Sequence, residues 1–335
     1  MVQDKKVGVI GGGSWGTTVA SLVSRNARCI LWARNADTVD EINQAHTNSK
    51  YLPGAQLAAK LSATHDLEEA VHEVDSIVMG IPSQSFRNVL QELRTLIRPG
   101  VPIISLTKGL ELNSGLRMTE IIRDLTPEQP CGVLTGPNLA REIMDGFAAA
   151  SVLAMENQDI IKDLQKLFHS GLFRVYTNHD VTGCELGGAL KNIIAIAAGI
   201  GDGLGSGDNT RAAFITRGLA EITRLGTAMG GEVQTFAGLT GMGDLVATCT
   251  SAQSRNRTVG FQLGKGRSID DIIADMFMVA EGVKSAGAVM ALAEKFQVEM
   301  PITREVKEVV QGKRRARDAL REMLRASIGS ESEPN

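Results

Sequence analysis

Two lysines lie in this sequence at places where a positive charge could act on a bound substrate. The first, Lys108, lies two residues after the short apolar stretch Ile103–Leu106. Residues just beyond the carboxyl end of a parallel strand face the ligand crevice of an open sheet. This position predicts a contact to an anion or a carbonyl group, although a solvated lysine fits the local pattern equally well.

The second lysine, Lys191, lies in the run Gly-Gly-Ala-Leu-Lys-Asn-Ile-Ile-Ala. Its neighbours three and four positions away on a helix are glycine, isoleucine and alanine, so no carboxylate is in helical reach. The ammonium must find polar groups elsewhere or extend to solvent. Burial lowers the pKa of a lysine, which suits a proton donor or acceptor near neutrality. The pattern predicts an acid–base lysine, with an extended surface lysine as the alternative.

Two polar groups further along the chain fit the same chemistry. Asp244 follows the glycine-rich turn Thr-Gly-Met-Gly at an apparent helix start, where it is either a helix cap or a catalytic carboxylate. Ser254, Arg255 and Asn256 bring a hydroxyl, a guanidinium and an amide together, as a phosphate monoester requires, although such a run is often a solvated face. The five histidines avoid all these motifs, so lysine is the better candidate acid.

A glycine-rich turn predicts the cofactor. The apolar run Val7–Ile10 is followed at once by Gly-Gly-Gly-Ser-Trp-Gly and then by a helical pattern. In this context Gly11 permits the tight turn, Gly13 lets the backbone approach a pyrophosphate, and Gly16 lets the helix pack on the strand. The helix N-terminus offers N–H groups and a partial positive charge to the anion. We therefore predict a dinucleotide site.

The cofactor preference is read at the end of the second predicted strand. An NAD site usually carries an acid there, whereas this chain has Arg34 and no carboxylate before Asp37. Arg34 can pair with a 2′-phosphate, which favours NADP or dual use, while an exposed loop arginine is the alternative. The segment Ile-Pro-Ser at 81–83 resembles a loop over the cofactor; the alternative is a turn that only separates two structural elements.

These residues need a scaffold, and the first half of the chain predicts one. Apolar runs of strand length alternate with helical patterns such as Thr17–Ser24 and Phe86–Ile97. This alternation indicates a doubly wound parallel sheet, a Rossmann fold over residues 1–180. The predicted strands are Val7–Ile10, Cys29–Trp32, Ser76–Ile81, Ile103–Leu106, Gly132–Leu134 and Ser151–Met155, with Phe173–Thr177 as one more.

From about residue 180 the pattern becomes helical. Long segments rich in alanine, leucine and isoleucine replace the strand-length runs. We predict an all-α domain over residues 181–328 and a flexible polar tail over 329–335. The predicted helices are Val181–Gly199, Arg211–Met229, Ser268–Phe277, Ser285–Phe296 and one amphipathic helix over Ile302–Ala326.

Composition excludes several classes of protein. The 335 residues carry a net charge of −3, with 43% hydrophobic and 4% aromatic residues. No broad positive field suits nucleic acid, and no apolar run approaches the ~20 residues of a membrane span. The four cysteines are scattered and lack metal-ligand spacing, which indicates buried apolar residues. We expect a soluble cytoplasmic protein without a metal.

Seven ordered motifs resemble those of the soluble bacterial NAD(P)-dependent glycerol-3-phosphate dehydrogenases. They run from Val7 to about Arg325 and read GGGSWGT, SLTKGLE, LTGPNLARE, GALKNIIAIAAG, LTGMGDL, SRNRTVG and VAEGVKS. The resemblance implies a Rossmann domain followed by a helical domain like that of 6-phosphogluconate dehydrogenase, usually in a homodimer. It also implies reduction of dihydroxyacetone phosphate to sn-glycerol 3-phosphate, which feeds phospholipid synthesis.

The resemblance also assigns residues. Lys191 would be the general acid, Lys108 would bind and polarise the substrate, and Asp244 would bind its hydroxyl or orient a lysine. Arg255 and Asn256, with Ser254 nearby, would hold the phosphate. The NADP(H) or NAD(H) cofactor would be lined by Ser14, Trp15, Arg34, Lys108, Ala140, Arg255, Val279 and Glu281, and Gly136 and Asn138 would meet the substrate.

One residue departs from the family pattern. The family usually has serine or threonine where this chain has Asn138, and an amide still donates and accepts hydrogen bonds. We expect an adjusted contact there without loss of activity. Two alternatives remain: a β-hydroxyacid or 6-phosphogluconate type of dehydrogenase, and a nucleotide sensor without catalysis. The first needs carboxylate substrates, and the second predicts loss of the two lysines or Asp244.

Overall fold

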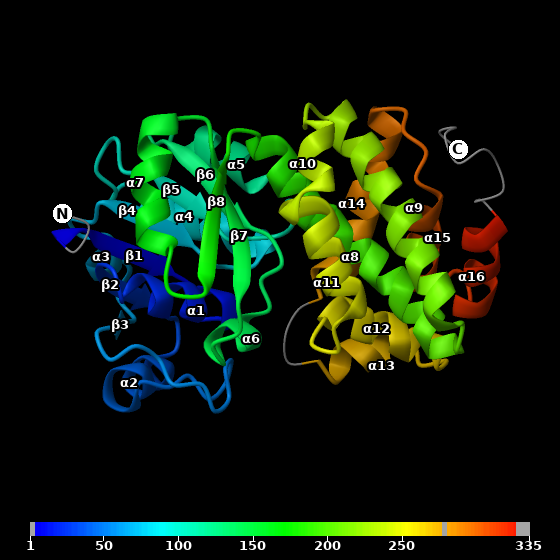
Figure 1. Ribbon diagram of the computed structural model, residues 1–335, viewed down its shortest axis with the longest axis horizontal. Helices are drawn as coiled ribbons and strands as arrows, with labels where there is room; N and C mark the ends of the chain where they lie inside the picture. Colours follow the sequence, from blue (N-terminus) through cyan, green and yellow to red (C-terminus); the bar gives the residue numbers. More distant parts are fainter. Residues whose placement is uncertain (1–3, 277–279, 326–335) are drawn as a thin grey trace. The chain divides into compact units, whose positions relative to one another are not determined.

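The computed structural model describes residues 4–276 and 280–325 of the chain (Figure 1). The polypeptide forms two compact units. Unit 1 comprises Met1–Thr107 and Leu116–Val181, and unit 2 comprises Lys108–Gly115 and Thr182–Asn335. The segment Lys108–Gly115 therefore groups with the helical unit, although the sequence pattern places it within residues 1–180. Leu110 accounts for this, because its side chain is 1% exposed and packs in the core of unit 2.

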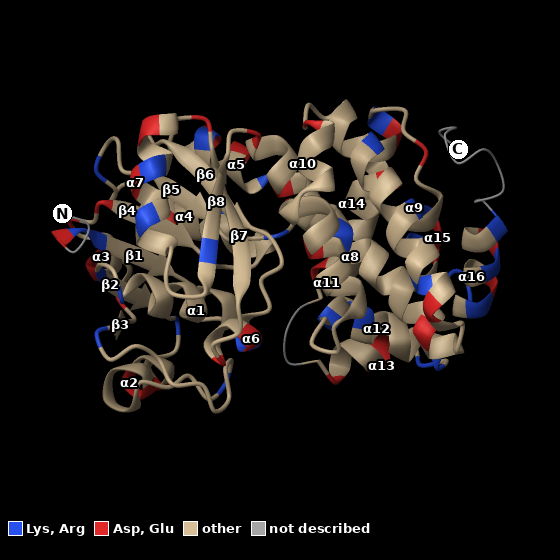
Figure 2. Ribbon diagram, in the orientation of Figure 1, with Lys and Arg blue, Asp and Glu red and all other residues tan. Residues whose placement is uncertain are grey.

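Unit 1 is built on one sheet with the strand order β3-β2-β1-β4-β5-β6-β7-β8. Its strands are β1 Lys6–Ile10, β2 Arg28–Trp32, β3 Ser62–Thr64, β4 Ser76–Met79, β5 Ile103–Ser105, β6 Cys131–Thr135, β7 Ala149–Met155 and β8 Phe173–Asn178. All neighbouring strands are parallel except β6 and β7, which pair antiparallel. Figure 2 shows that the strands carry few charged residues, as expected for a sheet covered on both faces.

Helices cover the two faces of this sheet, and a separate apolar cluster fills each side. One cluster includes Leu22 of α1 and Phe168 of α7, and the other includes Phe86 of α4 and Ile121 of α5. The helices of unit 1 are α1 Ser14–Val23, α2 Ala36–Ala45, α3 Leu67–Val71, α4 Ser83–Leu93, α5 Met118–Leu125, α6 Ala140–Met144 and α7 Gln158–Phe168. The predicted Rossmann fold is confirmed, with a mixed sheet in place of a wholly parallel one.

Unit 2 is helical in its described residues and is centred on α8, Val181–Leu204. This helix is long and apolar enough to span a membrane, but its most apolar window is 100% buried inside the protein, so it is a core helix. The other helices are α9 Gly207–Ala228, α10 Val233–Ala237, α11 Asp244–Thr250, α12 Arg255–Gly264, α13 Ile269–Ala274, α14 Glu281–Lys295, α15 Pro301–Val310 and α16 Ala316–Arg325, with a π-helical turn at Leu239–Gly243. The predicted all-α C-terminal domain is confirmed.

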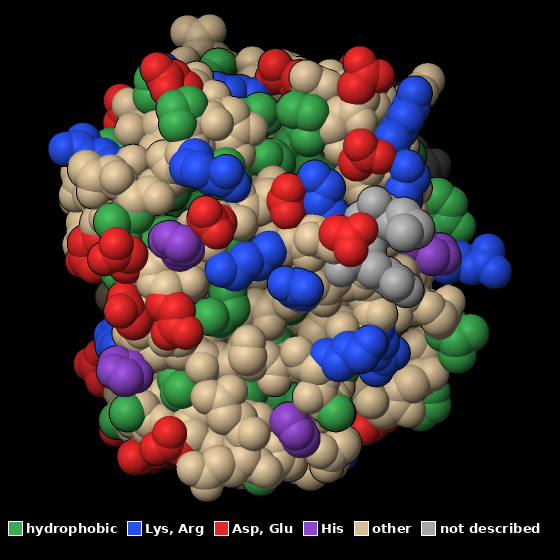
Figure 3. Space-filling model, turned by 90° about the vertical axis from the view of Figure 1, so that its left-hand side faces the viewer, with side chains coloured by type: hydrophobic (Ala, Val, Ile, Leu, Met, Phe, Trp, Pro, Cys, Tyr) green, Lys and Arg blue, Asp and Glu red, His purple; other side chains and the backbone are tan. Residues whose placement is uncertain are grey.

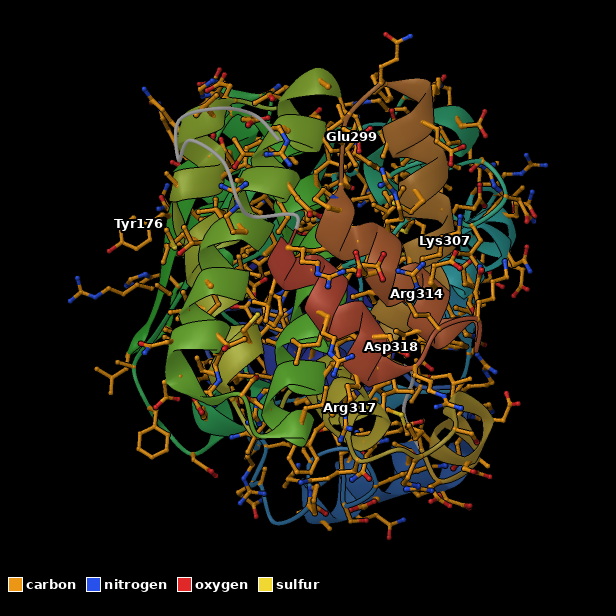
Figure 4. The ribbon with its side chains drawn as sticks, turned by 90° about the vertical axis from the view of Figure 1, so that its right-hand side faces the viewer. Tyr176, Glu299, Lys307, Arg314, Arg317 and Asp318 are labelled. Atoms are coloured by element: carbon orange, nitrogen blue, oxygen red, sulfur yellow. The ribbon has the colours of Figure 1, made fainter. Side chains whose placement is uncertain are left out.

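The C-terminal segment differs from the single predicted helix. It forms α15 and α16, which are separated by a turn in which Gly312 has a φ of +69°. Glycine adopts this left-handed conformation without steric cost, and it ends the helix there. Arg314, labelled in Figure 4, folds back onto α15 and pairs with Glu305 at 2.7 Å. The break lets α16 pack its own apolar face, which includes Ala319 and Met323.

Close approach of two helices positions the polar residues of unit 2. A Cβ at Gly199 of α8 would lie 2.1 Å from the carbonyl oxygen of Arg257, and one at Gly260 of α12 would lie 2.0 Å from that of Ile196. Only glycine permits this backbone-to-backbone contact. It fixes the first turn of α12 against the helix that carries Lys191. The four cysteines of the chain are free and buried.

Candidate functional site

The lysine cluster of unit 2 centres on Asp244, whose side chain is 2% exposed at the start of α11. Its Oδ1 accepts a hydrogen bond from the Nζ of Lys191 at 2.6 Å, and its Oδ2 accepts one from the Nζ of Lys108 at 2.7 Å. The carboxylate therefore pairs with both ammonium groups and does not serve as a helix cap. Three charges from three distant sequence positions meet in one buried place.

The fold provides Lys191 with the carboxylate that is missing three or four positions away on α8. Besides Asp244, the ammonium donates to the hydroxyl of Thr248, which in turn donates to the carbonyl oxygen of Asp244 at 2.6 Å. Two of its three N–H groups therefore have protein acceptors in the described part of the chain. The third is available to an oxygen atom of a substrate.

Lys108 titrates closer to neutrality than an ordinary lysine. Burial lowers its pKa to about 8, the carboxylate of Asp244 opposes this, and the charge of Lys191 lowers it further. The side chain keeps 17% of its surface exposed. A lysine of this kind is mostly a cation at neutral pH and becomes neutral in mildly alkaline solution.

A chain of amides joins these lysines to the predicted phosphate cluster. Asn192 donates to the carbonyl oxygen of Lys108 at 3.3 Å and accepts from the Nδ2 of Asn256 at 3.0 Å. The Oδ1 of Asn256 accepts from the backbone N–H of Gly282 at 3.0 Å. The sequence analysis missed Asn192 and Thr248. Their signals were present, because Asn192 follows Lys191 and Thr248 lies one helical turn after Asp244.

The Ser254–Arg257 run begins helix α12. The hydroxyl of Ser254 caps the helix by accepting from the backbone N–H of Arg257. The guanidinium of Arg257 pairs with Asp202 at 2.7 Å and so stays within the fold. Arg255 is exposed beside Asn256, and its guanidinium experiences the charge of Glu281. The run is therefore a capped helix N-terminus with one arginine on its surface, and not merely a solvated face.

In unit 1, the glycine-rich turn lies where the strand order reverses, after β1 and beside β4. Gly11 has a φ of +124°, and a Cβ on Gly16 would lie 2.0 Å from the carbonyl oxygen of Gly11. A Cβ on Gly13, in contrast, would have nothing within 4 Å. Gly11 and Gly16 thus serve tight packing, and Gly13 leaves an open cradle at the N-terminus of α1. This arrangement fits the pyrophosphate of a dinucleotide.

The other predicted cofactor residues of unit 1 lie on three segments. Arg34 follows β2, is exposed and has no partner among the described residues. The hydroxyl of Ser14 donates to the carbonyl oxygen of Tyr51 at 2.8 Å. The indole of Trp15 packs edge-on against Phe173 with 6.1 Å between ring centroids, which directs its ring into the core. Ala140 begins α6.

The predicted substrate residues of unit 1 follow β6. Gly136 has a φ of +135°, which favours glycine. Asn138 donates from its Nδ2 to the hydroxyl of Ser151 at 3.3 Å, while its Oδ1 is buried without a hydrogen-bond partner in the described structure. A buried, unpaired amide oxygen is costly unless a ligand or water satisfies it. Of the remaining predicted residues, Glu281 begins α14 of unit 2, and Val279 lies outside the described residues.

Comparisons with known proteins agree with both halves of this description. The family model for the N-terminus of NAD-dependent glycerol-3-phosphate dehydrogenase matches residues 6–161, and the model for its C-terminus matches residues 180–321. The chain belongs to the NAD-dependent glycerol-3-phosphate dehydrogenase family. It is an oxidoreductase that uses NAD(P), as the sequence motifs predicted.

Relatives resemble the chain over nearly its whole length. Glycerol-3-phosphate dehydrogenase (NAD(P)+) 2 of Sphingopyxis alaskensis is 67% identical over 329 residues, covering 98% of this chain and 99% of that protein. The crystal structure of glycerol-3-phosphate dehydrogenase from Coxiella burnetii superposes with a TM-score of 0.91 at 38% identity, covering 96% of this chain and 99% of that one.

A solved dehydrogenase of low sequence identity shares the fold alone. A D-mandelate dehydrogenase bound to NADH superposes with a TM-score of 0.56 at 14% identity, covering 92% of this chain and 98% of that one. Such a likeness says nothing of substrate. Among the described residues, no group of three or more His, Cys, Asp or Glu side chains could hold a metal ion.

Proposed function

We propose that the protein catalyses the reversible reduction of dihydroxyacetone phosphate to sn-glycerol 3-phosphate with NADPH or NADH, and so supplies glycerol 3-phosphate for phospholipid synthesis. The observation that carries the proposal is the pair of lysine ammonium groups sharing the buried carboxylate of Asp244. A ketone reductase needs a proton donor and a positive charge at the carbonyl oxygen. The two lysines provide both, and the cofactor supplies the hydride when bound.

Lys191 is the proton donor in this proposal. Its free N–H can reach a substrate oxygen while Asp244 and Thr248 hold the amine in place. As the carbonyl carbon is reduced, negative charge develops on the oxygen, and Lys191 transfers a proton to it. The neutral amine that remains is still hydrogen-bonded to both neighbours and regains its proton from solvent.

Lys108 binds and polarises the same oxygen or its neighbouring hydroxyl. Its charge is stabilised by Asp244 but weakened by burial, with a pKa of about 8. Because burial leaves this charge poorly solvated, it interacts strongly with a substrate oxygen atom that develops negative charge. Asp244 uses both carboxylate oxygens to orient the two ammonium groups, so we assign it a positioning role.

Arg255 and the N-terminus of α12 hold the phosphate of the substrate in this proposal. The guanidinium offers two parallel N–H groups to phosphate oxygens, and the helix N-terminus favours an anion. Asn256 uses its Oδ1 and one N–H inside the protein, which leaves its second N–H for the phosphate. Ser254 supports this place by capping the helix. A triose phosphate suits the cluster better than a carboxylate-bearing substrate.

The remaining assignments belong to the same proposal. Gly11, Gly13 and Gly16 with the first turn of α1 hold the pyrophosphate, and Arg34 meets the adenosine ribose or its 2′-phosphate. Ser14, Trp15, Lys108, Ala140, Arg255, Val279 and Glu281 line the cofactor, and Gly136 and Asn138 meet the substrate. Residues 1–180 act as the cofactor domain and 181–328 as the substrate domain; the predicted tail, 329–335, lies outside the described residues. We also propose a cytoplasmic homodimer.

The test is the Lys191→Ala variant with dihydroxyacetone phosphate as substrate. We expect kcat to fall by roughly 10²-fold or more, the usual effect of removing a general acid. Lys191→Arg keeps the charge but holds its proton too tightly to donate it, so it should also lose most activity. Lys313→Ala, an exposed lysine of unit 2, is the matched control and should retain activity.

Three results would contradict the proposal. Unchanged turnover in Lys191→Ala would show that another group donates the proton. Oxidation of NAD(P)H with 3-hydroxyacid precursors, but not with dihydroxyacetone phosphate, would favour the β-hydroxyacid class. Absence of turnover with every keto substrate, despite tight NADPH binding, would favour a nucleotide sensor.

A further inference from the structure

A hollow of about 680 Å³ opens at the amino ends of β1, β2 and β3 in unit 1. Its wall includes Lys6 at the start of β1, Arg28 at the start of β2 and Lys60 before β3. Arg25, in the turn that leads from α1 to β2, completes the basic lining, and Asp4 is the one acidic residue of the wall. The amino end of β1 lies at the left of Figure 1, and Figure 3 shows that face, where Lys and Arg side chains lie among Asp and Glu side chains.

Three of these cations have no partner among residues 4–276 and 280–325. Arg25, Arg28 and Lys60 are exposed and make no ion pair or side-chain hydrogen bond in the described part of the chain. Lys6 uses one N–H within the protein, because its Nζ donates a hydrogen bond to the carbonyl oxygen of His72 at 2.7 Å. Elsewhere in unit 1, Arg87 pairs with Asp124 and Arg123 with Glu156. The hollow thus gathers three positive charges for which the described side chains form no ion pair.

Asp4 lines the hollow, and a second carboxylate and two carbonyl groups beside it already have partners within unit 1. Asp75, the nearby carboxylate between α3 and β4, is bound by the Nζ of Lys5 at 2.8 Å and by the backbone N–H of Lys6 at 2.8 Å. The carbonyl groups at the end of α1 are also satisfied, since those of Ala20 and Val23 accept from backbone N–H groups. The carboxylate of Asp75 and these two carbonyl groups therefore already have hydrogen-bond donors.

We propose that this hollow binds a small anion carrying two or more linked phosphoryl groups. Two guanidinium groups and one ammonium, from two neighbouring segments, can each meet a different anionic oxygen. Guanidinium groups bind phosphate oxygens in pairs, which favours phosphoryl groups as ligands. A singly charged ligand would leave two cations unmatched. The volume lies within the range of about 300–1,000 Å³ that is usual for small-molecule sites.

This site is distinct from the cofactor site. The glycine-rich turn follows the carboxyl end of β1 at Ile10, whereas the hollow lies at the amino end of the same strand at Lys6. Four residue steps of about 3.3 Å each separate the two ends, roughly 13 Å along the strand. The proposal concerns a second ligand, goes beyond the proposed reaction and does not depend on the substrate of that reaction.

The test is a calorimetric titration in which inorganic pyrophosphate is added to the full-length protein and the heat of binding is measured. NADPH and glycerol 3-phosphate are both present at saturation, so that the cofactor and substrate sites are filled and no turnover occurs. We expect one pyrophosphate to bind, more tightly than inorganic phosphate, and more weakly as salt is raised. The double variant Arg25→Gln/Arg28→Gln should weaken binding by roughly tenfold or more.

A matched control separates a built site from general charge. Arg94→Gln/Arg174→Gln removes two exposed arginines of unit 1 that form no ion pair with any described residue and lie away from the hollow, and pyrophosphate binding should persist. Lys60→Gln alone should also weaken pyrophosphate binding, because it removes one of the three cations of the hollow. The KM for NADPH should stay the same in all these variants, which shows that unit 1 remains folded.

Three outcomes would overturn the inference. The first is that wild type binds no pyrophosphate under these conditions. The second is that Arg25→Gln/Arg28→Gln binds it as tightly as wild type, which would place the ligand elsewhere. The third is equal weakening in the control pair, which would show only a general effect of protein charge.

Discussion

Replacing Asp244 with asparagine should change how activity depends on pH, because this carboxylate stabilises the charge of Lys108. The amide has the same shape but no charge, and it offers one acceptor oxygen where the carboxylate offers two. One ammonium therefore loses its acceptor and faces an NH₂ group. The pKa of Lys108, about 8 in the native protein, must fall, since burial and Lys191 still lower it and Asp244 no longer opposes them.

The size of the effect follows from the geometry. An opposite charge within hydrogen-bonding distance shifts the pKa of a buried group by about one to three pH units. The alkaline limb of kcat/KM for ketone reduction should therefore move from near pH 8 to about pH 7 or below. At neutral pH we expect kcat/KM to fall by roughly 10²-fold, because the proton donor is also misplaced. Initial rates of NADPH oxidation between about pH 6 and pH 10 measure both effects.

A matched variant tests whether the effect is local. Asp208→Asn removes a carboxylate of unit 2 that is 91% exposed and pairs with Arg211, and its pH profile should match wild type. An Asp244→Asn enzyme that is slower but keeps its alkaline limb near pH 8 would refute the role of Lys108. A limb moved to higher pH would refute the electrostatic reasoning itself.

Three further predictions concern the cofactor turn, cofactor choice and stability. Gly13→Ala should raise the KM for NADPH while leaving the melting temperature near wild type, because its Cβ meets no protein atom; an unchanged KM would contradict the open cradle. Arg34→Asp should lower the ratio of kcat/KM for NADPH over NADH by roughly tenfold or more, since a charged hydrogen bond to the 2′-phosphate is lost; a constant ratio would place Arg34 outside the site. Burial raises the pKa of Glu221 to about 7, although three hydrogen bonds from Ile302 and Thr303 lower it. The folded state therefore binds more protons than the unfolded state between about pH 4.5 and 7. Stability to urea should therefore decline as pH rises through that window, and Glu221→Gln should show a weaker decline; equal slopes would contradict this.

Local sequence signals predicted most of the elements. The glycine-rich turn, the helix around Lys191 and the main strands each have a periodicity or a glycine spacing that acts within a few residues. Three features escaped this reasoning. Strand β3, Ser62–Thr64, is only three residues long and carries no apolar run. The antiparallel pairing of β6 with β7 follows from how the connection returns through α6, five residues long, which no local pattern reveals.

The third missed feature was a break in the last helix. The amphipathic pattern continues through both α15 and α16, so periodicity alone predicts one helix. Gly312 was the available signal, because a glycine with positive φ commonly ends a helix. The spacing of apolar residues continues across the turn because both helices pack an apolar face on the same core. Val306 lies before the turn and Ala319 after it.

The sequence could predict which residues form the candidate site, but not which of them pair with one another. Lys108 and Asp244 are 136 residues apart, and Lys191 and Asp244 are 53 apart. Each residue type and position indicated a role, yet no sequence rule states that one carboxylate serves both lysines. Thr248 and Asn192 were missed for the same reason: each is an ordinary polar residue until tertiary structure places it beside a charge.

The amide chain also changes how the phosphate cluster should be interpreted. Asn256 links Asn192 to the backbone N–H of Gly282, and Asn192 in turn holds the carbonyl oxygen of Lys108. Removing Asn256 would leave a buried N–H without an acceptor, at a cost of about 1–3 kcal/mol in stability, and would loosen the segment that carries Lys108. A loss of activity in an Asn256 variant would therefore not separate weaker phosphate binding from a displaced Lys108. Arg255, exposed at the start of α12, is the residue whose removal probes the phosphate contact most directly.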